Sequence, residues 1–498
     1  MSTKDVSTPN SEYTEMAEAR KLPNALMGGT AAMRAAKQVY LPQEMAESDG
    51  AYKNRLNRSI LFNKFEDTVS TLTGLVFQKP VALHAVPPDV EEWAKNIDLT
   101  GRDLSTFSRD VLRESGMVDG IGFILVDFQR RPEDVTTMAQ EKAAGLRPYL
   151  IHVKADNLIG WKSEKVGGVM TLTQIRIKEC VEVPDGEFDT KDEEQIRVLE
   201  PGTVRLYRNP DGKGWAVFDE WTTSLDFIPL VAFYGKRDDF MEGCPPLSNL
   251  AWLNLEHWQV SSDYRNINHV VCVPILFGAG LSSESTKLEI GASRMATGPE
   301  GSTLAFVEHS GQGLAGIERQ LANLETKMER FSGEMVATGV AKTATESGID
   351  ESNAHSKLQT IALGLQAALD QALGFMCKWV SIDLGEGHTE VNTDFDESDL
   401  APQTLLALND ARSKGLISQE VYSYNLKRGE MFPKDWTVED EQNALDAEGP
   451  KMMTLPTAGK APATGAPQPC PDCGAKCDTA NCPDCGAKMP AKAKPAVP

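Results

Sequence analysis

The sequence predicts an α+β protein that combines long helices, a mostly antiparallel β region and a flexible C-terminal tail. Two changes of apolar spacing predict this class. Apolar residues recur every three or four positions before residue 112 and again after residue 245, which is typical of amphipathic helices. Between about residues 121 and 235, short β-rich runs alternate with glycine-containing turns such as Pro-Asp-Gly, which is typical of antiparallel strands.

Length and composition describe a globular protein of several packing units. The chain has 498 residues, of which 41% are hydrophobic and 24% are charged, and its net charge is −22. Such an acidic chain is poorly suited to gripping nucleic acid by its phosphates. No window contains 18 uninterrupted apolar residues and the first residues lack an apolar leader, so we expect neither a membrane span nor a secretory signal.

Motifs that would indicate catalysis are absent. The sequence contains no GxxxxGK[ST], GxSxG or HExxH pattern, and its seven histidines are dispersed. The pair Gly120 and Gly122 precedes a strand-like run, whereas a dinucleotide site places its glycines after one. We therefore expect a protein that is not an enzyme.

The N-terminal half begins with a polar stretch, residues 1–38, that we expect to be a flexible arm. A helical pattern starts at Glu47 and continues to Lys79-Pro80, where proline ends it. A second, shorter helix is expected from Leu104 to a close near Gly116. Together with the β region, these elements make up residues 39–244.

Three long helices are expected after residue 245. The first covers 245–271 and the second covers 312–336, where Leu314, Ile317, Leu321, Leu324, Met328, Phe331 and Met335 form an a/d stripe. The insert between them, 272–311, should contain strands at Ile275–Phe277 and Thr303–Val307. Small and polar residues at 337–352 should break the helix, and Asn353 should cap a third helix within 353–399. Residues 400–449 show shorter helical patterns.

The one chemical motif lies in the tail. Cys470-Pro-Asp-Cys473-Gly and Cys482-Pro-Asp-Cys485-Gly repeat the same knuckle, and two such turns supply the four thiolates of a tetrahedral Zn²⁺ site. Cys477 could replace Cys470. Four cysteines leave no open coordination position, so a structural role is expected for the zinc knuckle at 470–488. A linker at 450–469 precedes it and a disordered end at 489–498 follows it.

Several stretches of the chain resemble a phage-encoded family known as a domain of unknown function. They include Tyr40-Leu41-Pro42, Glu47 to Tyr52, Arg55 to Ser59, Phe77 to Pro80, the helix Leu247–Val271 with Val273 to Gly278, and Thr343 to Glu346. The resemblance covers about 40–430. Members of this family resemble the portal proteins of tailed bacteriophages, and the cysteine tail is a departure from the family pattern.

The resemblance implies a ring, usually of twelve subunits, at one capsid vertex of the virion, assembled in the host cytoplasm. It implies a wing (39–244), a two-helix stem (245–271 and 312–336), a clip (272–311), a tunnel loop (337–352), a long wing helix with a strand (353–399) and a crown (400–449). Thr338, Lys342, Thr343 and Thr345 of the loop would face double-stranded DNA that passes through without being held. The implied partners are the large terminase subunit, the major capsid or scaffold protein and a neck or head-completion protein.

Two other functions remain open from the sequence. The chain could be another virion structural protein, such as a head–tail adaptor or minor capsid protein. It could also be a nucleic-acid-associated factor that uses a zinc ribbon, although the tail carries a net charge of only +2 over residues 454–498.

Overall fold

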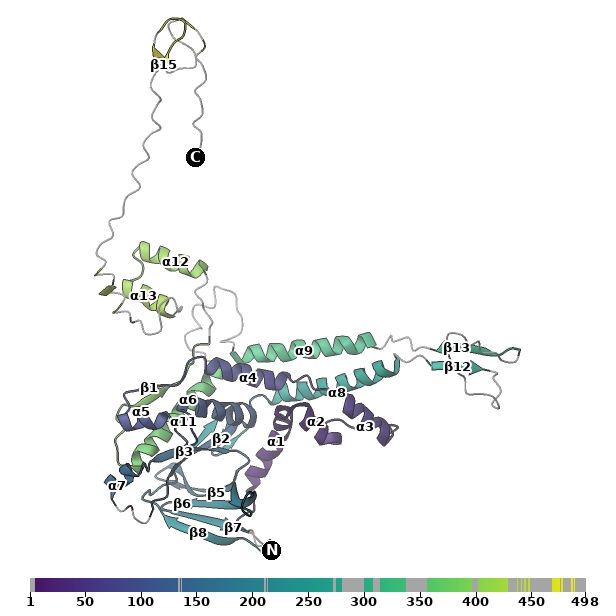
Figure 1. Ribbon diagram of the computed structural model, residues 1–498, viewed down its shortest axis with the longest axis vertical. Coiled ribbons are helices and arrows are strands. Elements are labelled where there is room, and N and C mark those ends of the chain that lie inside the picture. Colours follow the sequence, from purple (N-terminus) through teal and green to yellow (C-terminus); the bar gives the residue numbers. More distant parts are fainter. Residues whose placement is uncertain are drawn as a thin grey trace. The chain divides into compact units, whose positions relative to one another are not determined.

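The computed structural model describes two compact units, residues 1–395 and 396–498. The described residues are 5–132, 135, 137–209, 212, 214–271, 275–279, 300–307, 314–336, 356–395, 402–428, 437, 440, 443–444, 447, 468–474, 476–477, 485–486 and 488. Figure 1 shows the elements in chain order by colour. Helices and antiparallel strands are both extensive among them, which confirms the α+β class.

The first unit opens with a set of short helices. They are α1 (Ser11–Met27), α2 (Gly29–Ala36), a 3₁₀ turn (Lys37–Val39), α3 (Asp49–Arg58), α4 (Lys64–Val76), α5 (Pro88–Ala94) and α6 (Leu104–Asp110). Helix α6 continues into a π-helical segment, Val111–Asp119, which ends at Gly120. Gly120 has φ +79°, and a Cβ atom there would lie 1.9 Å from the carbonyl oxygen of Cys244, so only glycine fits.

The β region forms two antiparallel sheets. The three-stranded sheet has the order β3-β2-β9, from β2 (Ile121–Phe128), β3 (Pro148–Lys154) and β9 (Leu230–Tyr234). The five-stranded sheet follows chain order, with β4 (Leu158–Val166), β5 (Val169–Pro184), β6 (Thr190–Glu200), β7 (Thr203–Arg208) and β8 (Ala216–Thr222). Smaller elements are α7 (Met138–Ala143), β1 (Ala82–His84), β10 (Arg237–Asp239) and β11 (Glu242–Gly243).

Long helices follow the sheets. They are α8 (Ser248–Val271), α9 (Leu314–Val336) and α11 (Lys357–Trp379), with β12 (Ile275–Ala279) and β13 (Thr303–Val307) between α8 and α9, and β14 (His388–Glu390) after α11. Strand β14 pairs with β1. In the second unit, α12 (Pro402–Ser413) and α13 (Gln419–Arg428) contact each other, and β15 (Gln468–Pro469) pairs with β16 (Lys476–Cys477).

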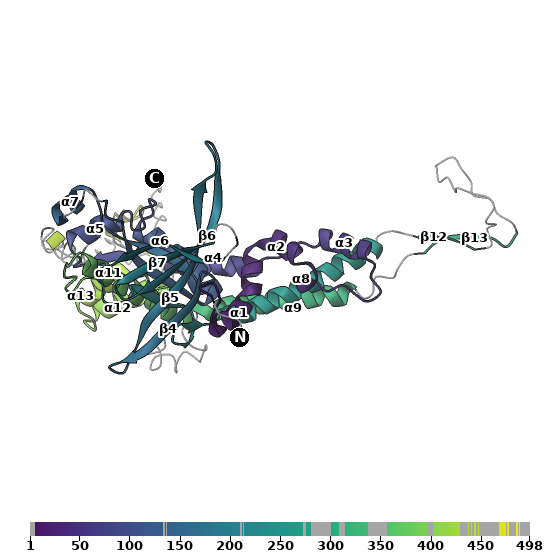
Figure 2. The same cartoon turned by 90° about the horizontal axis from the view of Figure 1, so that it is seen from below.

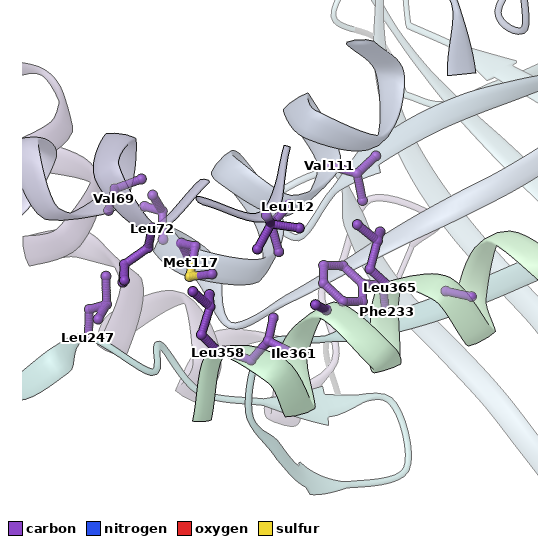
Figure 3. Close-up of a cluster of buried hydrophobic side chains, with 14 of the residues drawn as sticks. Val69, Leu72, Val111, Leu112, Met117, Phe233, Leu247, Leu358, Ile361 and Leu365 are labelled. Atoms are coloured by element: carbon purple, nitrogen blue, oxygen red, sulfur yellow. The ribbon is translucent and has the colours of Figure 1, made fainter. Parts of the chain in front are cut away.

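Helix α11 lies at the centre of the main core. Its side chains pack with residues of α4, the π-helical segment, β9 and the start of α8, as Figure 3 shows for Leu358, Ile361 and Leu365. By length and composition α11 could cross a membrane, but half of its apolar window is buried inside the protein. Its apolar character is therefore accounted for by a core position.

Residues 5–38 correct the prediction of a flexible arm. Helices α1 and α2 bury Leu26 and Met33 completely. Polar bonds hold the same segment against the sheet, where Arg20 pairs with Asp156 at 2.9 Å and Asn10 donates to the carbonyl of Trp161 at 2.9 Å. The apolar positions of this segment are too sparse for the sequence pattern to show that they are covered.

Two helix boundaries also differ from their predictions. The helix expected from Glu47 to Lys79 is two helices, because Ser59 ends α3 and Asn63 caps α4 by accepting from the amide of Glu66. Helix α11 begins after Ser356, whose hydroxyl and Gln359 form a reciprocal capping box; it ends at Trp379 rather than at Gly385. The predicted cap, Asn353, lies outside the described residues.

A buried carboxyl beneath α1 makes stability depend on pH. Asp119 is 5% exposed and accepts a 3.0 Å hydrogen bond from Asn24 of α1. Burial raises the pKa of Asp119 from 3.8 to about 6, despite the opposing effects of Arg20 and Asn24. The ionised folded state is therefore disfavoured at pH 7, and stability from this group is gained as the pH falls through 6 toward 4.

Replacing Asp119 by asparagine should consequently stabilise the protein at pH 7 by about 3 kcal/mol, since one pKa unit corresponds to 1.36 kcal/mol. Denaturant unfolding of the wild type and D119N at pH 7 and pH 4 measures this difference. The advantage of D119N should shrink below pH 6 and vanish near pH 4. Equal stability of the two proteins at pH 7 would contradict the assignment.

Candidate functional site

Helices α8 and α9 form an antiparallel pair of nearly equal length. They contain 24 and 23 residues, about 36 and 35 Å at 1.5 Å per residue. His257 of α8 faces Glu325 of α9, with Nε2 and Oε1 3.2 Å apart, and the Tyr264 hydroxyl donates to Glu318 at 2.7 Å. Figures 1 and 2 both show the two helices side by side. The helices expected at residues 245–271 and 312–336 are therefore present in the structure and have nearly equal lengths.

The apolar stripe of α9 is covered over only part of its length. Leu324, Met328 and Met335 are buried, whereas Leu314, Ile317 and Leu321 are half-buried. On α8 the matching buried residues include Leu255 and Trp258. The end of the pair nearest the core is thus closed within one chain, and the distal end retains accessible apolar surface.

Polar side chains fix this helix pair to the N-terminal helices. Asn254 of α8 is fully buried and accepts from the amide of Phe65 at 2.9 Å while it donates to the carbonyl of Phe62 at 2.8 Å. Ser262 receives a 2.8 Å hydrogen bond from Ser59, and the hydroxyls of Thr68 on α4 and Ser332 on α9 lie 2.8 Å apart. These bonds account for the break between α3 and α4, because that break presents its backbone groups to α8.

An arginine anchor adds an ionic link at the same place. Arg55 of α3 forms two hydrogen bonds of 2.8 Å with the carboxylate of Glu47 and lies 3.5 Å from Asp263 of α8. The hydrogen bonds from Arg55 hold the pKa of Glu47 below its ordinary value. Sequence patterns gave no indication of this contact, because its partners are about 208 residues apart.

A β-hairpin lies in the insert between the two helices. Strands β12 and β13 pair antiparallel from Ile275 opposite Val307 to Ala279 opposite Thr303. This confirms the two strands expected in residues 272–311. The predicted DNA-contacting residues Thr338, Lys342, Thr343 and Thr345 lie outside the described residues.

Three of the predicted zinc ligands come together in the second unit. The sulfur atoms of Cys470, Cys473 and Cys485 all lie within 4.8 Å of one another, and those of Cys470 and Cys485 are 3.6 Å apart. Cys482 lies outside the described residues, and Cys477, the possible substitute, lies on β16. Gly474 and Gly486, the glycines that follow the two knuckles, both have φ +73°.

This geometry fits a shared ion better than a disulfide. A disulfide requires an S–S distance near 2.05 Å. A tetrahedral site with Zn–S bonds of 2.3 Å places its sulfur atoms about 3.8 Å apart, close to the 3.6 Å separation of Cys470 and Cys485. Gly474 and Gly486 stand at the same place in the two repeats, and the equal φ is consistent with the left-handed conformation that glycine permits after each knuckle.

The structure also contains a serine–histidine pair that the sequence motifs did not reveal. Ser115 Oγ lies 2.7 Å from His152 Nε2, and Glu114 lies 4.0 Å from His152 Nδ1. Burial lowers the pKa of His152 to about 4, so the ring is neutral at pH 7. Ser115 is 0% exposed, so no substrate can approach its hydroxyl, and we interpret the pair as a satisfied hydrogen bond inside the core.

Comparisons with known proteins give one family match. Residues 246–380 match a family model described as a domain of unknown function, DUF4055. This match confirms the predicted resemblance to such a family. The matched segment contains α8, β12, β13, α9 and α11, and it is shorter than the range of 40–430 over which the resemblance was expected. No curated protein matches the sequence.

Similar solved structures come from gene transfer agent particles. The neck of the native particle, computed with C12 symmetry, has a TM-score of 0.36 and 10% identity, covering 73% of this chain and 89% of that one. The neck of the empty particle, computed with C6 symmetry, has a TM-score of 0.36 and 12% identity, and the match covers 72% of this chain and 88% of that one. A chain from the virion of the native particle has a TM-score of 0.37 and 11% identity, and the match covers 79% of this chain and 98% of that one.

Proposed function

We propose that this protein is a phage virion structural protein, specifically a portal that forms a ring at one capsid vertex. The observation that carries the proposal is the antiparallel α8–α9 pair, with the β12–β13 hairpin in its connecting insert and its other end fixed to an α+β body. Two rods of equal length can wall a conduit when copies are repeated around an axis. The accessible apolar residues at the distal end of α9 leave surface for a neighbouring copy to cover.

Each segment then has a proposed role. The stem would be 245–271 with 312–336, the clip 272–311, the wing 39–244, the tunnel loop 337–352, the long wing helix 353–399 and the crown 400–449. The buried hydrogen bonds of Asn254 and Ser262 support the division between stem and wing. They attach the first half and the middle of α8 to the region of α3 and α4.

Charge on α9 is compatible with a duplex that passes without being held. The exposed charged residues of this helix are balanced, with three acidic and three basic side chains: Glu318, Glu329, Glu334, Arg319, Lys327 and Arg330. A balanced face gives no row of cations on which phosphates would be retained. With the chain as a whole at −22, tight DNA binding is not expected.

The portal proposal includes its location and partners. The ring would sit in the virion after assembly in the host cytoplasm. It would receive DNA from the large terminase subunit, contact the major capsid or scaffold protein and carry a neck or head-completion protein. No catalytic step is assigned to the chain.

A closed ring is the expected result for the purified full-length protein. Twelve copies of 54.3 kDa would have a mass of about 650 kDa, and negative-stain images should show discs with a central hole. Native mass measurement over a range of protein concentrations tests this. A stable monomer at high concentration would overturn the proposal, and an open or irregular assembly would favour a head–tail adaptor or minor capsid protein.

The C-terminal segment has a separate proposed role as a zinc knuckle. Cys470, Cys473 and Cys485 would hold Zn²⁺ together with Cys482, and the ion would stabilise a segment too short to bury a core. Four thiolates complete the coordination of zinc, so the site is structural.

A further inference from the structure

Strand β5 is long enough to belong to two different hairpins. It runs from Val169 to Pro184, about 50 Å at 3.3 Å per residue. Its first part, up to Gln174, pairs only with β4, and its last part, from Lys178, pairs only with β6. The turns at its two ends therefore lie far apart. Figure 2 shows the β4–β5 and β5–β6 hairpins extending from the sheet in opposite directions.

Both hairpins project beyond the rest of the five-stranded sheet. We define the β4–β5 arm as residues 162–173 and the β5–β6 arm as residues 181–192. Strand β7 joins the sheet only opposite residues 195–200 of β6, so neither arm has a third strand. Because a two-stranded hairpin is marginal on its own in water, such arms usually gain stability from another surface.

Each arm ends in exposed apolar side chains. Val166, Val169 and Met170 at the turn of the β4–β5 arm are 60%, 68% and 41% exposed. Phe188 at the turn of the β5–β6 arm is 92% exposed. Apolar side chains concentrated at the ends of projecting hairpins indicate contact surfaces rather than solvent-facing loops.

The two arms carry opposite charge. The β4–β5 arm has Lys162, Lys165 and Glu164, a net charge of +1, and no ion pair joins either lysine to another described residue. The β5–β6 arm has five acidic residues and one lysine, a net charge of −4: Glu182, Asp185, Glu187, Asp189, Asp192 and Lys191. Opposite charges on opposite ends of one sheet are complementary between neighbouring copies.

We propose that the β4–β5 arm of one copy packs against the β5–β6 arm of the next copy. In this contact Phe188 would cover the apolar group of Val166, Val169 and Met170, and Lys162 and Lys165 would approach the carboxylates of Glu182, Glu187 and Asp189. The contact joins two different surfaces of the same chain, so it is head-to-tail and closes into a ring when the rotation permits. This proposal rests on the proposed ring. We call the contact between the β4–β5 arm of one copy and the β5–β6 arm of the next the clasp.

Charge reversal in the full-length protein tests the clasp. Lys162→Glu with Lys165→Glu changes the first arm from +1 to −3, and Glu182→Lys, Glu187→Lys and Asp189→Lys change the second from −4 to +2. Each reversed protein should need a concentration about tenfold or more higher to half-assemble, since like charges at an interface cost well over 1.4 kcal/mol. The protein that carries all five changes should regain assembly, because attraction between the arms is restored.

Conservative variants serve as controls. Lys162→Arg with Lys165→Arg keeps the charge and should assemble as the wild type does, and Phe188→Tyr should assemble better than Phe188→Ala. At concentrations too low for assembly, unfolding midpoints should be the same in all of these proteins and the wild type, since the exchanged side chains are exposed.

Three results would be decisive. If each protein with one reversed arm loses ring assembly and the variant with all five changes regains it, the clasp is established. Undiminished rings in both reversed proteins overturn the clasp and leave the portal proposal standing, and this includes the case in which the arms bind a different virion protein. A wild type that stays monomeric at every concentration overturns both proposals.

Discussion

Chelating zinc from the full-length protein should unfold residues 468–488 and leave the first unit folded. Structural zinc sites contribute about 10–16 kcal/mol of apparent binding free energy, far more than a short segment gains from its few buried side chains. Of Cys470, Cys473 and Cys485, Cys470 is buried and the other two are exposed. Its thiol and those of Cys473 and Cys485 converge within 4.8 Å, as a shared ion requires.

Metal analysis and thiol titration measure this effect. The wild type should contain one zinc per chain and lose it on chelation, with the thiols of the four ligands becoming reactive. Cys473→Ser should lose zinc and Cys477→Ser should retain it. Cys180→Ser, at an exposed cysteine of the first unit, is the matched control and should change neither zinc content nor stability. Protein that holds no zinc and has freely titrating thiols would refute the site.

Met328→Asp should abolish the packing of α8 against α9 and, with it, any ring. Met328 is 0% exposed and belongs to the main core. Placing an unpaired carboxylate there costs about 4–5 kcal/mol or more, which is a large share of the stability of a domain. The unfolding midpoint and the mass of the assembled protein are the two measurements.

Lys327→Asp is the matched control for this substitution, because Lys327 is the preceding residue of the same helix and is exposed. It should leave the unfolding midpoint nearly unchanged. Equal behaviour of the two variants would show that the face of α9 containing Met328 is not the packed one.

Elements with strong local patterns were predictable from the sequence. The a/d stripe predicted α9 within two residues at its start, and the proline and glycine positions around α8 and the β region gave their boundaries closely. The repeated CPDCG motif indicated its own chemistry, since thiolate spacing in a tight turn requires no distant partner.

Elements that depend on distant partners were not predictable in the same way. The attachment of α1 to the sheet involves Asp156 and Trp161, which follow Arg20 and Asn10 by more than 130 residues. The split between α3 and α4 depends on Asn254, and periodicity favoured a continuous helix because Ile60 and Phe62 fit its apolar positions although they are exposed. Ser356 displaced the predicted cap because it forms the capping box with Gln359.

The sequence by itself determined the class of fold, the two helices of nearly equal length and the knuckle cysteines. These features are local, because the spacing of residues along the chain decides which side chains share a helix face and which cysteines share a turn. Only the tertiary structure decided which part of the α9 stripe is covered, how the N-terminal helices attach and that β5 serves two oppositely charged arms. These features depend on contacts between residues far apart in the chain, whose free energy no local pattern contains.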